Sequence, residues 1–293
     1  MWAVMRPLQN FIYSAIILST SEFMRSIDSN PAFAGLEAAS RTRLAKVLRA
    51  THGTVTPESA AAALADTRLA ASKQLARWAE QGWLQRVRRG IYVPVPLESE
   101  RADAAPEDAW LIANTAFAPC FIAGWSAVEH WSLTEQVFRS LCVATSRRPR
   151  HREQTIGGTV FVLHSVPAAH LFGLKAVWRG ADRVQVSDPS RTLVDLLATP
   201  AWGGGIRTVV DVLQAYLKSE HRNLPLLVDY AARLGNGAVF KRMGYLLEQH
   251  APEATEVIAA CAGRLTAGYT KLDPALPSAR LVTAWGLWLP AGW

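Results

Sequence analysis

The chain has few cysteines, and their scarcity argues against a domain stabilised by disulfide bonds or by a zinc ion. Its only cysteines are Cys120, Cys142 and Cys261, which lie far apart in 293 residues, and none belongs to a Cys-x-x-Cys pair. An odd number at this spacing indicates neither a disulfide framework nor a zinc site. We therefore expect three small buried residues in a protein of the reducing cytoplasm.

The N-terminal region lacks an apolar run long enough to cross a bilayer. The stretch 11–18 is apolar, but a spanning helix needs about 20 such residues. No small-residue cleavage site follows, as a signal peptide would require. We expect residues 1–35 to be an extension outside the core, with Met24 as an alternative start. A membrane or export role is the less favoured alternative.

Short enzyme motifs are also missing. The sequence contains no His-Glu-x-x-His, no P-loop and no Gly-x-Ser-x-Gly, and the glycines 203–205 are not followed by Lys-Ser or Lys-Thr. Glu129 and His130 are adjacent, and neighbouring residues of a helix point about 100° apart, so they would rarely act on one atom. We predict no catalytic residue, no metal site and no cofactor.

Acidic residues are scarce in one region, which gives the protein its positive charge. Between residues 40 and 95 there are ten basic and three acidic side chains, whereas the rest of the chain has 21 of each. That excess of seven equals the formal net charge of the whole protein. A basic module attached to a neutral body indicates a polyanionic partner at one end. A solvated basic surface without a partner is the alternative.

The same region has the outline of a winged helix-turn-helix. Leu44, Val47 and Leu48 give a helix over 36–50 one apolar stripe. Thr56 and Pro57 are typical of a helix N-cap and first position. Asp66 and Thr67 can cap a third helix, 68–81, whose apolar face is Ala71, Leu75, Trp78 and Ala79, and Gly82 is suited to end it. Two short strands joined by Arg88-Arg89-Gly90 complete the pattern.

In such modules the third helix enters the major groove and a basic wing follows the phosphate backbone. We expect base or phosphate contacts from its N-terminal half and phosphate contacts from Arg77 and the wing. An ordinary exposed side chain is the alternative for each of them. The candidate DNA-binding residues are Thr67, Arg68, Ser72, Lys73, Arg77, Arg86, Arg88 and Arg89.

The rest of the chain predicts a second domain of mixed α/β structure. We expect residues 36–97 to form the DNA-binding domain, 98–109 a linker and 110–293 the second domain. Its expected strands are 137–144, 159–166, 184–186 and 281–289, and 121–131 should pass from an extended piece into a helix. One further helix is expected to start at Pro189, after Asp188, and to run to about Leu197. Three more helices are expected over 206–218, 224–234 and 238–249. Glycines 203–205 indicate a turn, and the arginine-rich segment 147–152 indicates a solvated loop.

Two polar clusters in this domain favour structural roles. Asp188, Arg191 and Asp195 recur at helical spacing on one face, so we expect Arg191 to bridge both acids in a salt-bridge ladder. His164 and His170 have no ligand-like neighbours and should be structural. A functional site at the ladder is the less favoured alternative.

Four segments in order resemble the AbiEi-type antitoxins of bacterial type IV toxin–antitoxin and abortive-infection systems. They are WLQRVRRGIYVPVP, GWSAVEHWSLTEQ, VSDPSRTLVDLL and NGAVFKRMGYLLE, and the resemblance spans about Arg41 to Leu289. It implies a winged helix that represses its own operon at inverted repeats in double-stranded DNA. It also implies an α/β domain that counteracts a nucleotidyltransferase-like toxin without a stable complex.

Two other functions stay open at this point. An ordinary transcriptional regulator could use its α/β domain to sense a small ligand or to dimerise. A nuclease or related enzyme could use the winged helix to hold nucleic acid. The gene neighbourhood and a toxin-rescue assay separate the first from an antitoxin, and a turnover assay with divalent metal tests the second.

Overall fold

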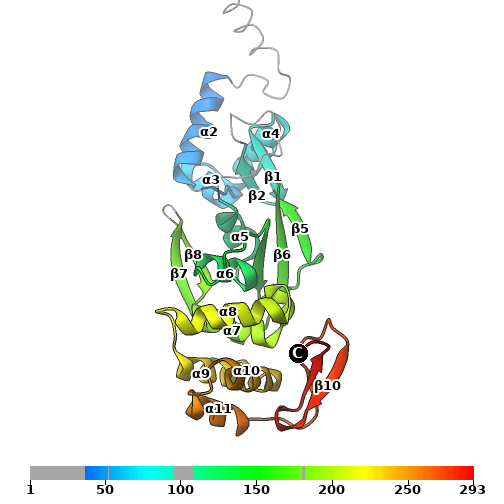
Figure 1. The fold of residues 1–293 in the computed structure, drawn as a ribbon. Helices are drawn as coiled ribbons and strands as arrows, with labels where there is room; N and C mark the ends of the chain where they lie inside the picture. The colour runs from blue at the N-terminus through cyan, green and yellow to red at the C-terminus, as the bar shows by residue number, and fades with distance from the viewer. Residues whose placement is uncertain (1–36, 52, 96–107, 157, 180–181) are drawn as a thin grey trace, which may run out of the picture. The chain divides into compact units, whose positions relative to one another are not determined.

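The protein is a mixed α/β molecule, as the sequence predicts, and 48% of the residues that the structure describes are helical and 22% are in strands. The computed structural model describes residues 37–51, 53–95, 108–156, 158–179 and 182–293 (Figure 1). One compact unit contains residues 37–51 and 55–95, and the other contains 53–54 and 108–293. The expected extension 1–35 and most of the expected linker 98–109 lie outside the described residues.

The first unit is a winged helix. Helices α2 (Ala38–Ala50), α3 (Pro57–Leu64) and α4 (Arg68–Glu80) precede the antiparallel strands β1 (Leu84–Arg88) and β2 (Ile91–Pro94). Val55 adds a third short extended segment, since its backbone exchanges hydrogen bonds of 2.7 and 2.9 Å with Tyr92. The predicted helices and hairpin are therefore present in the predicted order.

Helix ends in this unit follow the predicted capping chemistry. The Thr56 hydroxyl accepts from the Ser59 N–H at 3.2 Å, and the Ser59 hydroxyl accepts from the Thr56 N–H at 2.9 Å. This reciprocal pair satisfies two N–H groups that the helix leaves without partners. Gly82 has a φ of 78°, so the chain leaves α4 in the left-handed conformation that favours glycine.

The second unit is built around a six-stranded mixed sheet. Its strand order is β5-β6-β4-β3-β8-β7, with β3 parallel to β8 and β4 parallel to β6. The strands are β3 (Cys120–Ile122), β4 (Ser140–Thr145), β5 (Glu153–Ile156), β6 (Thr159–Ser165), β7 (Leu174–Arg179) and β8 (Asp182–Ser187). A separate three-stranded sheet contains β9 (Thr270–Lys271), β10 (Ser278–Val282) and β11 (Leu287–Pro290).

Helices of the second unit pack around α7, which is buried along all but its last residue. Every residue from Pro189 to Leu197 is buried, and α6, α8, α9 and α10 all contact this helix (Figure 1). Because no face of α7 reaches water, its polar residues must find partners inside the protein. The helices are α5 (Ala109–Phe117), α6 (Gly124–His130), α7 (Pro189–Ala198), α8 (Ile206–Lys218), α9 (Leu224–Leu234), α10 (Gly237–His250) and α11 (Thr255–Ala262), with 3₁₀ turns at Ala168–His170, Pro200–Gly203 and Thr283–Trp285.

The predicted salt-bridge ladder on α7 is only half correct. Arg191 Nε pairs with Asp195 Oδ1 at 2.9 Å, but Asp188 caps the helix by accepting from the Arg191 N–H at 2.8 Å. The second Asp188 oxygen accepts from the Tyr230 hydroxyl at 2.7 Å. Arg191 donates instead to the carbonyls of His170 and Phe172. Because the Asp188 side chain caps the helix, Arg191 forms a salt bridge with Asp195 alone.

The predicted last strand, 281–289, is wrong. The chain turns at Gly286, where φ is 58°, and the segment divides into β10 and β11, which pair antiparallel. Trp285 lies at the turn, is buried and donates to Glu248 Oε2 at 2.6 Å. Its ring occupies the space above Gly244, where an added Cβ would lie 2.0 Å away. Burial of this indole explains the break in the strand.

Three smaller features complete the description of the second unit. Strands β5, β7 and β9 and helices α5 and α11 are absent from the sequence prediction. Cys120, Cys142 and Cys261 are free and buried. Within the described residues, no helix is long and apolar enough to span a membrane.

Candidate nucleic-acid interface

Helix α4 is held so that one face is exposed. Ala71, Leu75 and Trp78 are buried in the core of the winged helix, and the Trp78 indole donates to the Ser40 hydroxyl of α2 at 3.0 Å. With 3.6 residues per turn, the opposite face carries Leu69, Lys73 and Arg77, which are all exposed. The predicted division between core face and candidate contact face of this helix is present in the structure.

The turn before α4 is fixed by local hydrogen bonds. Ala65 takes a left-handed conformation with a φ of 53°, and Asp66 accepts from the Thr67 N–H at 2.8 Å. The Thr67 hydroxyl accepts from the Ala70 N–H at 3.2 Å and so caps α4. Arg43 of α2 forms a salt bridge with Asp66 at 3.1 Å and so links the turn to α2. The exposed Thr67 therefore stabilises the N-terminus of α4.

The wing presents its cations on a short antiparallel hairpin. Arg88 pairs in register with Ile91, which leaves Arg89 and Gly90 as the turn, and Gly90 has a φ of 78°. A bulge shifts the register between Arg86 and Arg88. All three wing arginines are exposed. The turn glycine thus permits a tight tip that carries charge.

A groove lies between the N-terminal half of α4 and the wing. It has a volume of about 690 Å³ and brings together four of the eight predicted DNA-binding residues, Arg68 and Ser72 from α4 and Arg86 and Arg89 from the wing. Lys73, Arg77 and Arg88 are exposed but do not line it. The sequence predicted no DNA contact for the four other lining residues, which are Pro57, Leu69, Gly90 and Tyr92.

One groove cation already has a protein partner. Arg68 Nε lies 2.5 Å from Glu58 Oε1, and the two side chains are 74% and 60% exposed. A hydrogen bond from its own backbone N–H lowers the pKa of Glu58, and Arg68 lowers it further. An ion pair so exposed is weak, so phosphate can compete for Arg68.

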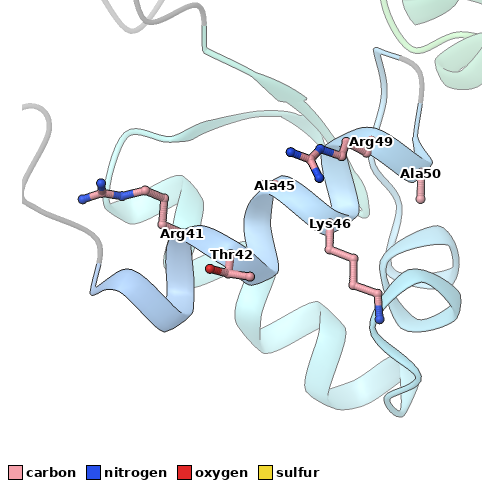
Figure 2. Close-up of a pocket in the computed structure, with 6 residues that line it drawn as sticks. All are labelled: Arg41, Thr42, Ala45, Lys46, Arg49 and Ala50. Atoms are coloured by element: carbon pink, nitrogen blue, oxygen red, sulfur yellow. The ribbon is translucent and has the colours of Figure 1, made fainter.

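Helix α2 carries a second basic surface. Arg41, Lys46 and Arg49 lie with Thr42, Ala45 and Ala50 around a hollow of about 650 Å³ (Figure 2). This face is opposite Leu44 and Val47, which are buried. The sequence charge count included these cations, but no contact role was assigned to them, although their helical spacing away from the apolar stripe is visible in the sequence.

The second unit has its own hollow, of about 420 Å³. Its lining includes Trp110, Glu129, His130, Arg139 and Arg179. The His130 ring packs edge-on against Trp110 and Trp131, and burial lowers its pKa, with Arg179 adding to the effect. Within the described part of the chain, no group of three or more His, Cys, Asp and Glu residues is placed to hold a metal ion.

The remaining polar residues of the second unit divide by exposure. Arg147, Arg148, Arg150, His151 and Arg152 are all exposed between β4 and β5. His164 is instead buried and stacked on Trp202 at 4.3 Å, with no hydrogen-bond partner for Nε2. His170 is half-buried in a 3₁₀ turn.

Comparison with known proteins identifies the winged-helix segment. Residues 43–95 match the family model described as transcriptional regulator, AbiEi antitoxin. The matched range begins within α2 and ends after β2, so it contains α3, α4 and the whole wing. No curated protein matches the chain. The match confirms the predicted resemblance over residues 43–95, and the other three segments of that resemblance lie outside the matched range.

Proposed function

We propose, from the AbiEi match of the winged helix, that this protein is the DNA-binding antitoxin of a type IV toxin–antitoxin pair. It represses its own operon by placing α4 in the major groove at inverted repeats. It counteracts a nucleotidyltransferase-like toxin without a stable complex, and it acts in the cytoplasm. The observation that carries the proposal is the groove in which Arg68, Ser72, Arg86 and Arg89 converge inside the matched segment.

The groove supports DNA as the partner because it combines the two kinds of contact that duplex recognition uses. Arginines on the wing can neutralise phosphates and so supply affinity that depends on salt. Side chains near the start of α4 can reach base edges, which supplies discrimination between sequences. Lys73 and Arg77 extend the positive surface along the exposed face of α4.

The test of DNA binding is a titration of the promoter upstream of the gene at several salt concentrations. We expect Arg88→Ala/Arg89→Ala to lower the affinity more than about tenfold at physiological salt. The slope of log affinity against log salt should shrink by about 0.9 for each lost phosphate contact. Binding is measured by fluorescence anisotropy on labelled duplex.

Arg207→Ala/Arg280→Ala is the matched control, because it removes the same charge from exposed positions of the second unit. It should leave the slope unchanged. An unchanged affinity and slope in Arg88→Ala/Arg89→Ala contradicts the role of the wing. Failure of the unaltered protein to bind its promoter contradicts the proposed function as a whole.

The antitoxin role has its own test. A nucleotidyltransferase-like reading frame beside this gene is expected, and induction of that toxin should arrest growth. Co-expression of the present protein should restore growth. Loss of rescue without loss of promoter binding would separate the two activities.

A regulator that senses a small ligand is the second candidate. The observation that favours it is the hollow of the second unit, where Trp110 and Arg139 lie with Glu129 and His130. A promoter-binding protein with no toxin gene beside it, and with DNA affinity that changes on addition of a small metabolite, would favour this function over the antitoxin.

A further inference from the structure

Leu69 is an apolar side chain exposed on a helix that is otherwise adapted to a charged partner. It is 69% exposed, and within residues 37–51 and 55–95 it is the single large hydrophobic side chain that is exposed to this degree. A lone exposed leucine needs no explanation by itself. Its position does, because it is the second residue of α4 and lines the groove between α4 and the wing.

The surroundings of Leu69 indicate what could cover it. Arg68 precedes it, Ser72 lies one turn further along α4, and Arg86 and Arg89 face the same groove from the wing. A partner that fills this groove must therefore satisfy cations and a hydroxyl while offering an apolar group to the leucine. A purely apolar partner would leave the guanidinium groups of Arg86 and Arg89 desolvated without compensation, which is costly.

Duplex DNA offers this combination at one kind of position. Its phosphates satisfy arginines, and its major groove exposes one methyl group, the C5-methyl of thymine, beside hydrogen-bonding base edges. The leucine side chain has no hydrogen-bonding group, so it gains nothing from the polar edges of guanine, adenine or cytosine. Contact with a methyl group buries apolar surface on both partners.

We propose that Leu69 reads a thymine of the operator through its C5-methyl group. The proposal rests on the proposed function, because it assigns one base contact to the DNA-binding groove. Arg68, Arg86 and Arg89 then position the helix, and Leu69 supplies a preference for thymine that a guanidinium group does not give.

The test replaces each thymine of the protected operator, one at a time, with deoxyuridine, which removes the C5-methyl group and little else. At one thymine of each half-site the affinity of the unaltered protein should fall about fourfold, the effect of one lost apolar carbon contact. Leu69→Ala should bind the thymine operator at least about fourfold more weakly. Deoxyuridine at the sensitive position should have no further effect on that variant.

Lys73→Ala is the control from the same exposed face of α4. It should bind more weakly, reduce the salt slope by about 0.9 and keep its sensitivity to deoxyuridine. Leu69→Ala should keep the full salt slope, because it removes no charge. Circular dichroism should show the same fold in both variants, since both positions are exposed.

The outcomes are distinguishable. Promoter binding that is indifferent to deoxyuridine at every thymine overturns the role of Leu69 and leaves the proposed function intact. The same is true if Leu69→Ala remains as sensitive to deoxyuridine as the unaltered protein. Absence of promoter binding overturns both proposals.

Discussion

Among the residues that the structure describes, the winged helix keeps its positively charged side chains exposed, whereas the second unit also buries some of its own. In the winged helix, Arg68, Arg77 and Arg89 are exposed. In the second unit, Arg191 and Arg242 are 1% and 2% exposed. Exposed cations contribute little to folding and remain available to a partner. Buried cations must be fully satisfied inside the protein, so they fix the packing around them.

Arg242 shows how completely a buried cation can be satisfied without a direct acid partner. Its guanidinium donates to the carbonyl oxygens of Leu197 at 2.7 Å, Lys271 at 2.8 Å and Leu272 at 3.0 Å. Burial lowers its pKa to about 10, and Asp273 opposes the shift. One side chain therefore joins the end of α7 to the segment around β9.

The largest expected effect is on this side chain. Arg242→Met should lower the free energy of unfolding by about 3–5 kcal/mol, because several buried carbonyls lose their donor at about 1–3 kcal/mol each. Urea unfolding followed by circular dichroism measures the change. Arg207→Met and Arg77→Met remove exposed arginines from each unit and should stay within about 0.5 kcal/mol of the unaltered protein. Equal effects of the three substitutions would end the contrast between the units.

The next effect is a pH dependence that belongs to the buried interior of the second unit. Burial, with a smaller contribution from Arg152, lowers the pKa of His164 to about 4. The unfolded chain binds the proton more readily. The contribution of His164 to the free energy of unfolding is therefore fully present above about pH 6.5 and is lost as the pH falls toward 4. The slope from this one group is at most about 1.4 kcal/mol per pH unit.

His164→Phe should remove that slope while keeping the stacking on Trp202. Unfolding curves measured between pH 4 and 7 give the comparison. The free energy of unfolding of the variant should rise relative to that of the unaltered protein as the pH falls. The exposed His151 supplies the control, since His151→Phe should keep the original profile. Parallel profiles for His164→Phe and the unaltered protein would contradict the buried neutral histidine.

The smallest effect is on the exposed ion pair of the groove. Glu58→Gln should leave the unfolding midpoint unchanged and raise promoter affinity about threefold, because Arg68 is released and a carboxylate that repels phosphate is removed. Glu37→Gln makes the same charge change at the exposed start of α2 and should raise affinity less. Equal gains would show that only net charge matters.

The sequence predicts best where caps and periodicity agree. Helices α8 and α9 lie at the predicted residues 206–218 and 224–234, because each has an amphipathic stripe at helical spacing. Asn223 caps α9, and Gly235 ends it in a left-handed conformation. The caps of α3 and α4 at Thr56 and Thr67 were likewise readable from residue type and order.

Two of the missed strands share a physical cause. Strands β5 and β7 are the two edges of the six-stranded sheet, and most of their residues remain at least partly exposed. An edge strand with little buried surface has no clear apolar pattern to recognise. Leu69 was missed as a groove residue for the opposite reason, since an apolar side chain outside the core stripe gives no charge signal.

The order of residues alone determined the capped helices, the basic hairpin and the concentration of positive charge in the winged helix, because these depend on neighbours within a few positions. Only the tertiary structure decided which cations remain outside and which are enclosed. Arg191 and Arg68 each pair with a carboxylate: Arg191 with Asp195 on the same helix, and Arg68 with Glu58 on the preceding helix. Their difference arises because α7 is surrounded by other helices whereas α4 keeps one face in water.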